Sequence, residues 1–225
     1  MVPETRFGVW FQNTEIWLRY VLAEAVADLV GLLGPGPHRF GTILDAGCGA
    51  GQAFPLIADR FDPECLIGVD ADPESIRDAG EAARGASPDV RLVLGDVSRL
   101  GLPDACVDLV LCHQTLHHTS DQESALREIR RVLKPGGRLL LAESCQRFIR
   151  SLSVRALFRH PMRAQHSADG YVRLVRAAGF VVPHENVATP SPFWARPDWG
   201  LLEWLGRPPS PAAEPTQVRI VAIRP

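Results

Sequence analysis

The sequence predicts an α/β fold in which helices cover both faces of a mostly parallel, doubly wound sheet. Apolar runs alternate with segments of helical periodicity, as in strand–helix–strand units. The apolar runs are nearly continuous, which is typical of strands buried on both faces. Residues 42–52 (TILDAGCGAGQ) lead from such a run through a glycine-rich turn into a helical pattern, and the rest of the chain is organised around them.

The composition is that of an ordinary globular domain. The chain has 225 residues, of which 46% are apolar and 22% are charged, and this suits one α/β domain. A net charge of −2 gives no basic face for a nucleic-acid partner. Neither a signal-peptide pattern nor a membrane-spanning apolar run is evident, so we expect a cytoplasmic protein without stable membrane insertion. Five cysteines without paired spacing indicate core residues.

The expected strands are short apolar runs bounded by turns or by an acid. We expect them from 42 to Asp45 and at 65–70, 90–96, 106–112, 138–143, 180–187 and 216–223. The expected helices carry apolar residues at helical spacing and recognisable caps. They cover 13–33 and 52–61, a segment capped by Asp72 with Pro73 at its first position, a segment beginning at a capping box of Ser120 and Glu123, and 167–178.

Three segments lie outside this alternation, so the single domain 1–225 divides into a core and coverings. Residues 41–144 are the expected cofactor-binding core, and residues 1–40 an N-terminal helical lid. The arginine-rich segment 145–166 and the proline-rich segment 189–215 are expected to be variable substrate lids. The tryptophans of 189–215 argue against simple disorder, although this segment could instead form a homodimer contact.

Acids end four of the expected strands. In an open α/β sheet, ligands bind beyond the carboxyl ends of the strands. These acids, Asp45, Asp70, Asp96 and Glu143, would therefore gather along one crevice. Clustered carboxylates repel one another unless donors or cations face them, so the crevice favours a ligand with hydroxyls, amines and positive charge. Separate capping or ion pairing of each acid is the alternative, and it is most plausible for Glu143.

The glycine turn indicates that a dinucleotide is a less suitable ligand. Alternate glycines let a backbone turn sharply and let a ligand approach it, and the next helix offers unpaired amides to a carboxylate or phosphate. The dinucleotide-binding fingerprint requires a glycine where this chain has Gln52. This difference disfavours a nicotinamide-dependent oxidoreductase.

Four segments resemble the class I S-adenosylmethionine-dependent methyltransferases. They are ILDAGCGAGQ, GVDAD, LVLGDVSRLGLPDACVDLVLCHQTLHH and ALREIRRVLKPGGRLLLAE, and together they cover 43–143 almost without a gap. The resemblance is to the small-molecule group, which includes the methyltransferase type 11 and ubiquinone/menaquinone C-methyltransferase families. It implies a Rossmann-like sheet of seven strands with the last antiparallel, and S-adenosyl-L-methionine as cofactor. It also implies in-line methyl transfer to an O, N or C atom of a small-molecule acceptor.

The same resemblance implies a role for each cofactor-binding position. The methionine moiety would be cradled by the backbone of Asp45, Ala46, Gly47, Cys48, Gly49 and Gly51. Asp70 would accept hydrogen bonds from the ribose hydroxyls, and Ala71 would lie against the adenine. Asp96 and the Val97 amide would pair with the adenine, whereas the Cys112–His113 backbone would face the methionine amine and the sulfonium.

The acceptor side is less defined by the sequence. A phenol, amine or acidic carbon must lose a proton, and His117 or His113 is the candidate base, with a loop-setting role as the alternative. No carboxylate stands at a zinc-site spacing from these histidines, so no metal is expected. The expected pocket residues are Phe7, Trp10, Phe11, Gln114, His117, Trp194 and Trp199. A non-catalytic S-adenosylmethionine-binding or regulatory protein is the alternative function.

Overall fold

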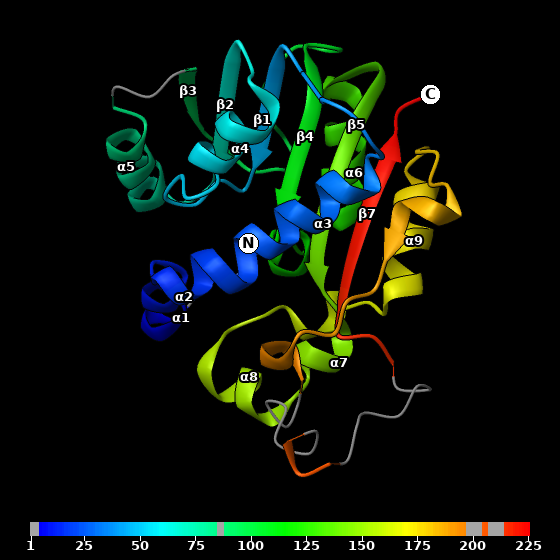
Figure 1. Cartoon of the computed structure of the whole chain (residues 1–225). Helices are drawn as coiled ribbons and strands as arrows, with labels where there is room; N and C mark the ends of the chain where they lie inside the picture. Colours follow the sequence, from blue (N-terminus) through cyan, green and yellow to red (C-terminus); the bar gives the residue numbers. More distant parts are fainter. Residues whose placement is uncertain (1–4, 85–87, 197–203, 207–213) are drawn as a thin grey trace.

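A seven-stranded sheet forms the centre of the computed structural model, which describes residues 5–84, 88–196, 204–206 and 214–225 (Figure 1). The strands are ordered β3-β2-β1-β4-β5-β7-β6. Their bounds are β1 Thr42–Ala46, β2 Cys65–Asp70, β3 Asp89–Leu94, β4 Val107–His113, β5 Leu133–Ser144, β6 Val187–Ala188 and β7 Gln217–Ile223. Strands β1 to β5 pair in parallel and β7 pairs antiparallel with β5, which confirms the expected fold class.

Helices cover both faces of this sheet (Figure 1). One apolar core contains residues of α6 (Gln122–Val132) and α9 (Ala168–Ala177), and the other contains residues of α3 (Glu24–Leu32), α4 (Phe54–Phe61) and α5 (Pro73–Ala82). The shorter helices are α1 Arg6–Gln12, α2 Glu15–Trp17, α7 Gln146–Ile149 and α8 Leu152–Leu157. They lie beyond the carboxyl ends of the parallel strands, together with the 3-10 turns η2 Leu116–His118, η3 Met162–Ala164 and η5 Phe193–Ala195. The remaining helical elements are the π-helical turn η1 Leu18–Ala23 and the 3-10 turn η4 His184–Asn186.

The structure corrects three sequence predictions. The helix expected at 13–33 is divided into α2, η1 and α3, because the chain passes through π-helical turns. Helix α6 is capped by Asp121, which accepts from the Ser124 amide, and not by the expected capping box. The prediction of a strand at 180–187 is wrong. Val181 makes a single bridge to Ile223, and β6 contains two residues. Pro183 interrupts this segment, since proline cannot donate to a sheet.

No helix within the described ranges is long and apolar enough to cross a bilayer.

Candidate functional site

The glycine turn after β1 packs against the loop after β4. The amides of Gly47 and Cys48 donate to the carbonyl of Val69, at 2.8 and 3.0 Å. Thr115 Oγ1 donates to the Ala46 carbonyl at 3.1 Å, which joins the two loops. Gly47 has a φ of +83°, and a Cβ placed on it would lie 2.3 Å from Thr115 Oγ1. Only glycine fits at this position, where the crevice between β1 and β4 begins.

Gly47→Ala is therefore expected to destabilise the protein more than a matched change at Gly101. Gly101 also has a positive φ, +67°, but no atom lies within 4 Å of its virtual Cβ. Backbone strain alone should cost Gly101→Ala about 1 kcal/mol. The added clash should cost Gly47→Ala about 1–3 kcal/mol more. Urea unfolding followed by circular dichroism measures both, and equal losses would contradict the close contact with Thr115.

Asp70 and Asp96 are oriented by neighbouring backbone amides. Asp70 ends β2, and its two oxygens accept from the amides of Gly49 and Asp72, each at 2.9 Å. Ala71 lies between Asp70 and Asp72 in the chain. Asp96 follows β3 and accepts from the amide and hydroxyl of Ser98 at 2.8 and 2.7 Å. Burial opposes ionisation of Asp96, but the Ser98 hydrogen bonds outweigh it and lower its pKa. Both carboxylates keep lone pairs for a ligand.

Asp45 is the acid with an unpaired buried oxygen. It is 2% exposed at the end of β1, and its Oδ2 accepts no hydrogen bond from any described residue. Burial raises the pKa of Asp45 to about 7, and the charge of Asp70 adds to this effect. Buried polar atoms in native proteins are nearly always paired. A ligand with a positive charge and hydrogen-bond donors would satisfy Asp45, as S-adenosylmethionine would.

Glu143 differs from Asp45, Asp70 and Asp96 because its contacts are with the loop after β4. Its Oε1 accepts from the amides of Thr115 and Leu116, at 2.9 and 2.6 Å. Its Oε2 lies 2.5 Å from Nδ1 of His117. Glu143 thus holds the loop after β4, and it does not line the crevice beside Asp45 and Asp70 as the pattern of strand ends suggested.

The two candidate bases differ in position. His117 is 3% exposed, and burial lowers its pKa to about 3, so the ring is neutral. Its Nδ1 shares a hydrogen bond with Glu143, and Nε2 would accept a proton in the tautomer in which Nδ1 is the donor; His117 also lines the cavity. His113 packs edge-on against Trp17 with ring centroids 5.5 Å apart. Burial, then Arg219 and His117, lower the pKa of His113 to about 3, and His113 does not line the cavity.

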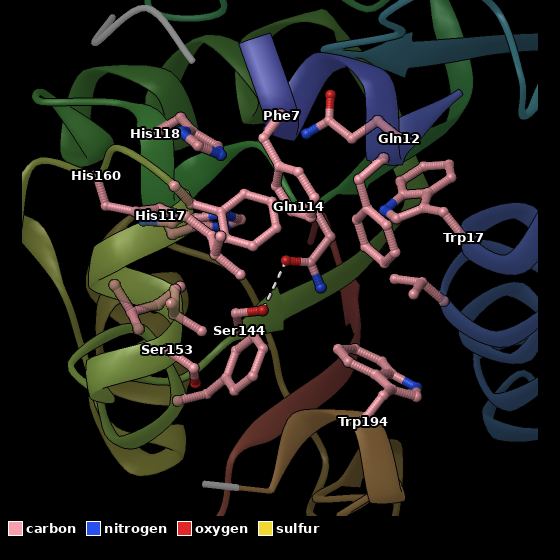
Figure 2. A pocket seen from close by; sticks show the side chains of 17 residues that line it. Phe7, Gln12, Trp17, Gln114, His117, His118, Ser144, Ser153, His160 and Trp194 are labelled. Carbon is pink, nitrogen blue, oxygen red and sulfur yellow. Dashed lines mark hydrogen bonds between the residues drawn. The ribbon is translucent and has the colours of Figure 1, made fainter. Parts of the chain in front are cut away.

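A mainly apolar cavity lies beside this loop (Figure 2). It is walled by residues of α1, α2, α7, α8 and η5, which come from both ends of the chain. The residues that the sequence expected and that line it are Phe7, Phe11, Gln114, His117 and Trp194. Further lining residues that sequence reasoning missed include Gln12, Trp17, His118, Ser144, Phe148 and His160. They share no spacing that could have identified them.

Two expected pocket residues are not among those that line this cavity. Trp10 is 61% exposed and lies outside the cavity lining. Phe7 and Phe11 stand one helical turn apart and their rings are parallel, with centroids 6.2 Å apart, so these two occupy the inner face of α1. Trp199 lies outside the described residues.

Gln114 supplies a polar atom to an otherwise apolar wall. Its Oε1 accepts from Ser144 Oγ at 2.7 Å, and its Nε2 donates to Gln217 Oε1 at 3.2 Å. Gln217 Nε2 donates in turn to Ser144 Oγ at 2.9 Å, which closes a ring of three side chains. Gln114 also has a φ of +53°, a conformation that non-glycine residues adopt mainly where their surroundings enforce it.

Comparison with known proteins agrees with this geometry. Residues 44–141 match the sequence model of the methyltransferase domain family. The 27-O-demethylrifamycin SV methyltransferase of Amycolatopsis mediterranei is 36% identical over 126 residues, which are 54% of this chain and 46% of that protein. The chain spans less than half the length of the curated relatives that it matches first.

Solved structures show the same fold at low sequence identity. An S-adenosylmethionine-dependent methyltransferase of Mesorhizobium loti superposes with a TM-score of 0.65 at 17% identity, covering 89% of this chain and 98% of that one. The [4+2]-cyclase SpnF superposes with a TM-score of 0.67 at 23% identity, covering 90% and 81%. The family assigned from the motifs is thus confirmed. Residues 44–141 thus carry a methyltransferase domain match, and the similar proteins imply S-adenosylmethionine as the cofactor.

Proposed function

We propose that this protein transfers a methyl group from S-adenosylmethionine to a small-molecule acceptor bound in the cavity of Figure 2. The observation that carries the proposal is the loop after β4, which joins the two sites. Thr115 of this loop contacts the glycine turn, whereas Gln114 and His117 line the cavity. The loop begins at Cys112 and His113, whose backbone is expected to face the sulfonium.

The N-terminal segment connects the same two sites from the opposite side. Gln52, directly after the glycine turn, donates from Nε2 to Asn13 Oδ1 at 2.7 Å. The neighbouring Gln12 lines the cavity. Helix α1 would therefore act as a cover that spans the cofactor crevice and the acceptor cavity. Such a cover would exclude water from the reacting atoms.

The chain's residues would position the reactants, exclude water from the cavity and supply a proton acceptor. S-adenosylmethionine supplies a methyl group that is already activated on a sulfonium, so in-line positioning is the main requirement. Phe7, Phe11 and Trp194 form apolar walls that suit an apolar or aromatic acceptor. The Gln114 amide would orient its polar edge, and the neutral His117 would take the proton that the acceptor loses.

Binding measurements test the cofactor half of the proposal. Calorimetric titrations with S-adenosylmethionine, with its demethylated product and with a nicotinamide dinucleotide should show binding of the first two alone. Binding of the dinucleotide without the sulfonium would overturn the assignment. A screen of aromatic acceptors with radiolabelled S-adenosylmethionine then tests transfer.

Cofactor binding without transfer is the second candidate, because the cyclase neighbour shows that this fold also carries a different reaction. A non-catalytic protein would bind S-adenosylmethionine and form no demethylated product with any acceptor. Chromatography of the cofactor after incubation with an acceptor mixture distinguishes the two functions. Accumulation of the demethylated product only with acceptor present supports methyl transfer.

Trp194→Ala should raise the KM for the acceptor about tenfold or more, because it removes an aromatic wall of the cavity. The Trp194 indole donates to the Tyr20 carbonyl at 2.9 Å and meets Phe148 edge-on, with centroids 5.8 Å apart. Trp10→Ala is the matched control, since that side chain is outside the cavity. Steady-state kinetics with an acceptor from the screen should show an effect for Trp194 alone. An equal effect of both changes would contradict this cavity as the acceptor site.

A further inference from the structure

Three histidines gather on one wall of the cavity (Figure 2). His117 and His118 belong to η2, and His160 follows α8. Their ring centroids are 4.2 Å apart for His117 and His118, 5.1 Å for His117 and His160, and 4.7 Å for His118 and His160. One potential ligand nitrogen from each ring lies within 4.8 Å of the others.

One of the three rings is oriented by a carboxylate. Nδ1 of His117 shares a hydrogen bond with Glu143, so its Nε2 is the nitrogen left for a ligand. Metal-binding histidines in proteins usually donate their second ring N–H to a carboxylate or carbonyl, which fixes the tautomer and the ring direction. Glu143 is held in turn by the amides of Thr115 and Leu116.

Two buried glutamines tie the histidine segments together. Gln122 Nε2 donates to the carbonyls of Leu116 and Ala164, both at 2.7 Å. Gln165 Nε2 donates to the carbonyls of His117 and Pro161, at 2.8 and 3.1 Å. The segment after His160 is thereby fastened to η2, which places His160 beside the other two histidines.

We propose that His117, His118 and His160 bind one divalent transition-metal ion of the zinc class, with a fourth coordination position open to the cavity. Imidazole ligands suit zinc and its neighbours, and three protein ligands with one open position are typical of catalytic zinc sites. Zn–N bonds of about 2.0–2.1 Å require nitrogens about 3.3 Å apart, so the rings must close slightly on the ion. His118 is the last residue of η2 and His160 lies between α8 and η3, and rotation about their χ angles would move the rings toward the ion.

An oxygen atom of a cavity occupant would be the natural fourth ligand. A bound metal polarises such an oxygen and lowers its pKa, which would help an acceptor hydroxyl to ionise. This last step rests on the proposed function, whereas metal binding does not. His117 could not also take the acceptor's proton while its Nε2 is coordinated, so in the metal-bound form that proton would pass to bulk water. The competing interpretation is that the three imidazole rings only pack against one another and bind no metal.

Cobalt is the probe that tests the site, because Co²⁺ takes zinc geometries and absorbs visible light. Titration of tag-free protein with Co²⁺ alone, without S-adenosylmethionine, should give one equivalent of a tetrahedral visible spectrum that Zn²⁺ abolishes. Sulfur-to-cobalt charge transfer should be absent, which excludes the cysteines. His118→Ala and His160→Ala should each weaken binding by at least about tenfold. His184→Ala, an exposed histidine elsewhere, is the matched control and should bind normally.

Circular dichroism establishes that each variant is folded before its affinity is compared. Acetohydroxamate, a small oxygen chelator, should then change the cobalt spectrum of the wild-type protein. The metal site is overturned if the wild-type protein does not saturate at micromolar Co²⁺, or if neither variant weakens binding. The open coordination position is overturned if acetohydroxamate leaves the spectrum unchanged. None of these readouts depends on methyl transfer.

Discussion

Asp70→Ala is expected to weaken S-adenosylmethionine binding by ten- to a hundredfold, or about 1–3 kcal/mol, because ribose hydroxyls would lose their acceptor. The Asp70 carboxylate is oriented by the amides of Gly49 and Asp72, and each of its oxygens keeps a lone pair. The residue ends β2, so the sheet should form without it. Isothermal titration of the folded variant measures the loss.

Asp72→Ala is the matched control for Asp70→Ala. Asp72 caps α5 and accepts from the amide and hydroxyl of Ser75, at 3.0 and 2.8 Å. Loss of the cap should cost about 1 kcal/mol of stability. The cofactor affinity of this variant should stay near that of the wild-type protein. Normal affinity in folded Asp70→Ala would contradict the cofactor site.

The sequence predicted the sheet well where strands are buried on both faces. The expected strand 65–70 agrees with β2 at both ends, because an apolar run there is bounded by an acid. Strand β5 begins at Leu133, before the expected start at 138, and so includes Lys134-Pro135-Gly136-Gly137, a sequence typical of a turn. Lys134 is fixed by Asp108 at 2.8 Å, and this contact joins residues far apart in the sequence. Local turn chemistry could not reveal it.

The cofactor edge was predictable for a physical reason that does not extend to the acceptor cavity. Parallel strands carry their terminal acids to one edge, so Asp45, Asp70 and Asp96 could be placed from strand ends alone. Glu143 shares that pattern, yet it binds η2, and only tertiary contacts distinguish it. The cavity is built from short helices and turns without a common period. For that reason Phe148 and His160 were missed.

Gln52 makes a structural contact that the glycine motif does not indicate. In the sequence, it marks the absence of a dinucleotide fingerprint. In the structure, its side chain binds Asn13 and so connects the glycine turn to the N-terminal helices. A glycine at this position could not form that contact. The departure from the fingerprint thus coincides with a contact between the glycine turn and the N-terminal segment.

Asp45→Asn is expected to stabilise the ligand-free protein at pH 8, by roughly 2–4 kcal/mol in the free energy of unfolding. Burial raises the pKa of Asp45 from 3.8 to about 7, with Asp70 contributing. The folded protein therefore favours the protonated carboxyl, and the unfolded chain favours the carboxylate. The stabilising contribution of Asp45 is complete below pH 3.8 and is lost as the pH rises through 7. Asparagine cannot ionise and avoids this loss.

The stabilisation should shrink steadily from pH 8 to pH 5, and urea unfolding at intermediate values would trace it. Asp59→Asn, a change of the same type at an exposed site, should alter stability by less than about 0.5 kcal/mol at every pH. If Asp45 faces the positive charge of S-adenosylmethionine as proposed, the cofactor should stabilise the wild-type protein more than Asp45→Asn. If the free energies of unfolding of wild type and Asp45→Asn changed with pH in parallel, that result would contradict a raised pKa of Asp45. A variant that is more stable when empty but binds the cofactor less well would show that Asp45 is kept for binding, at a cost to the fold.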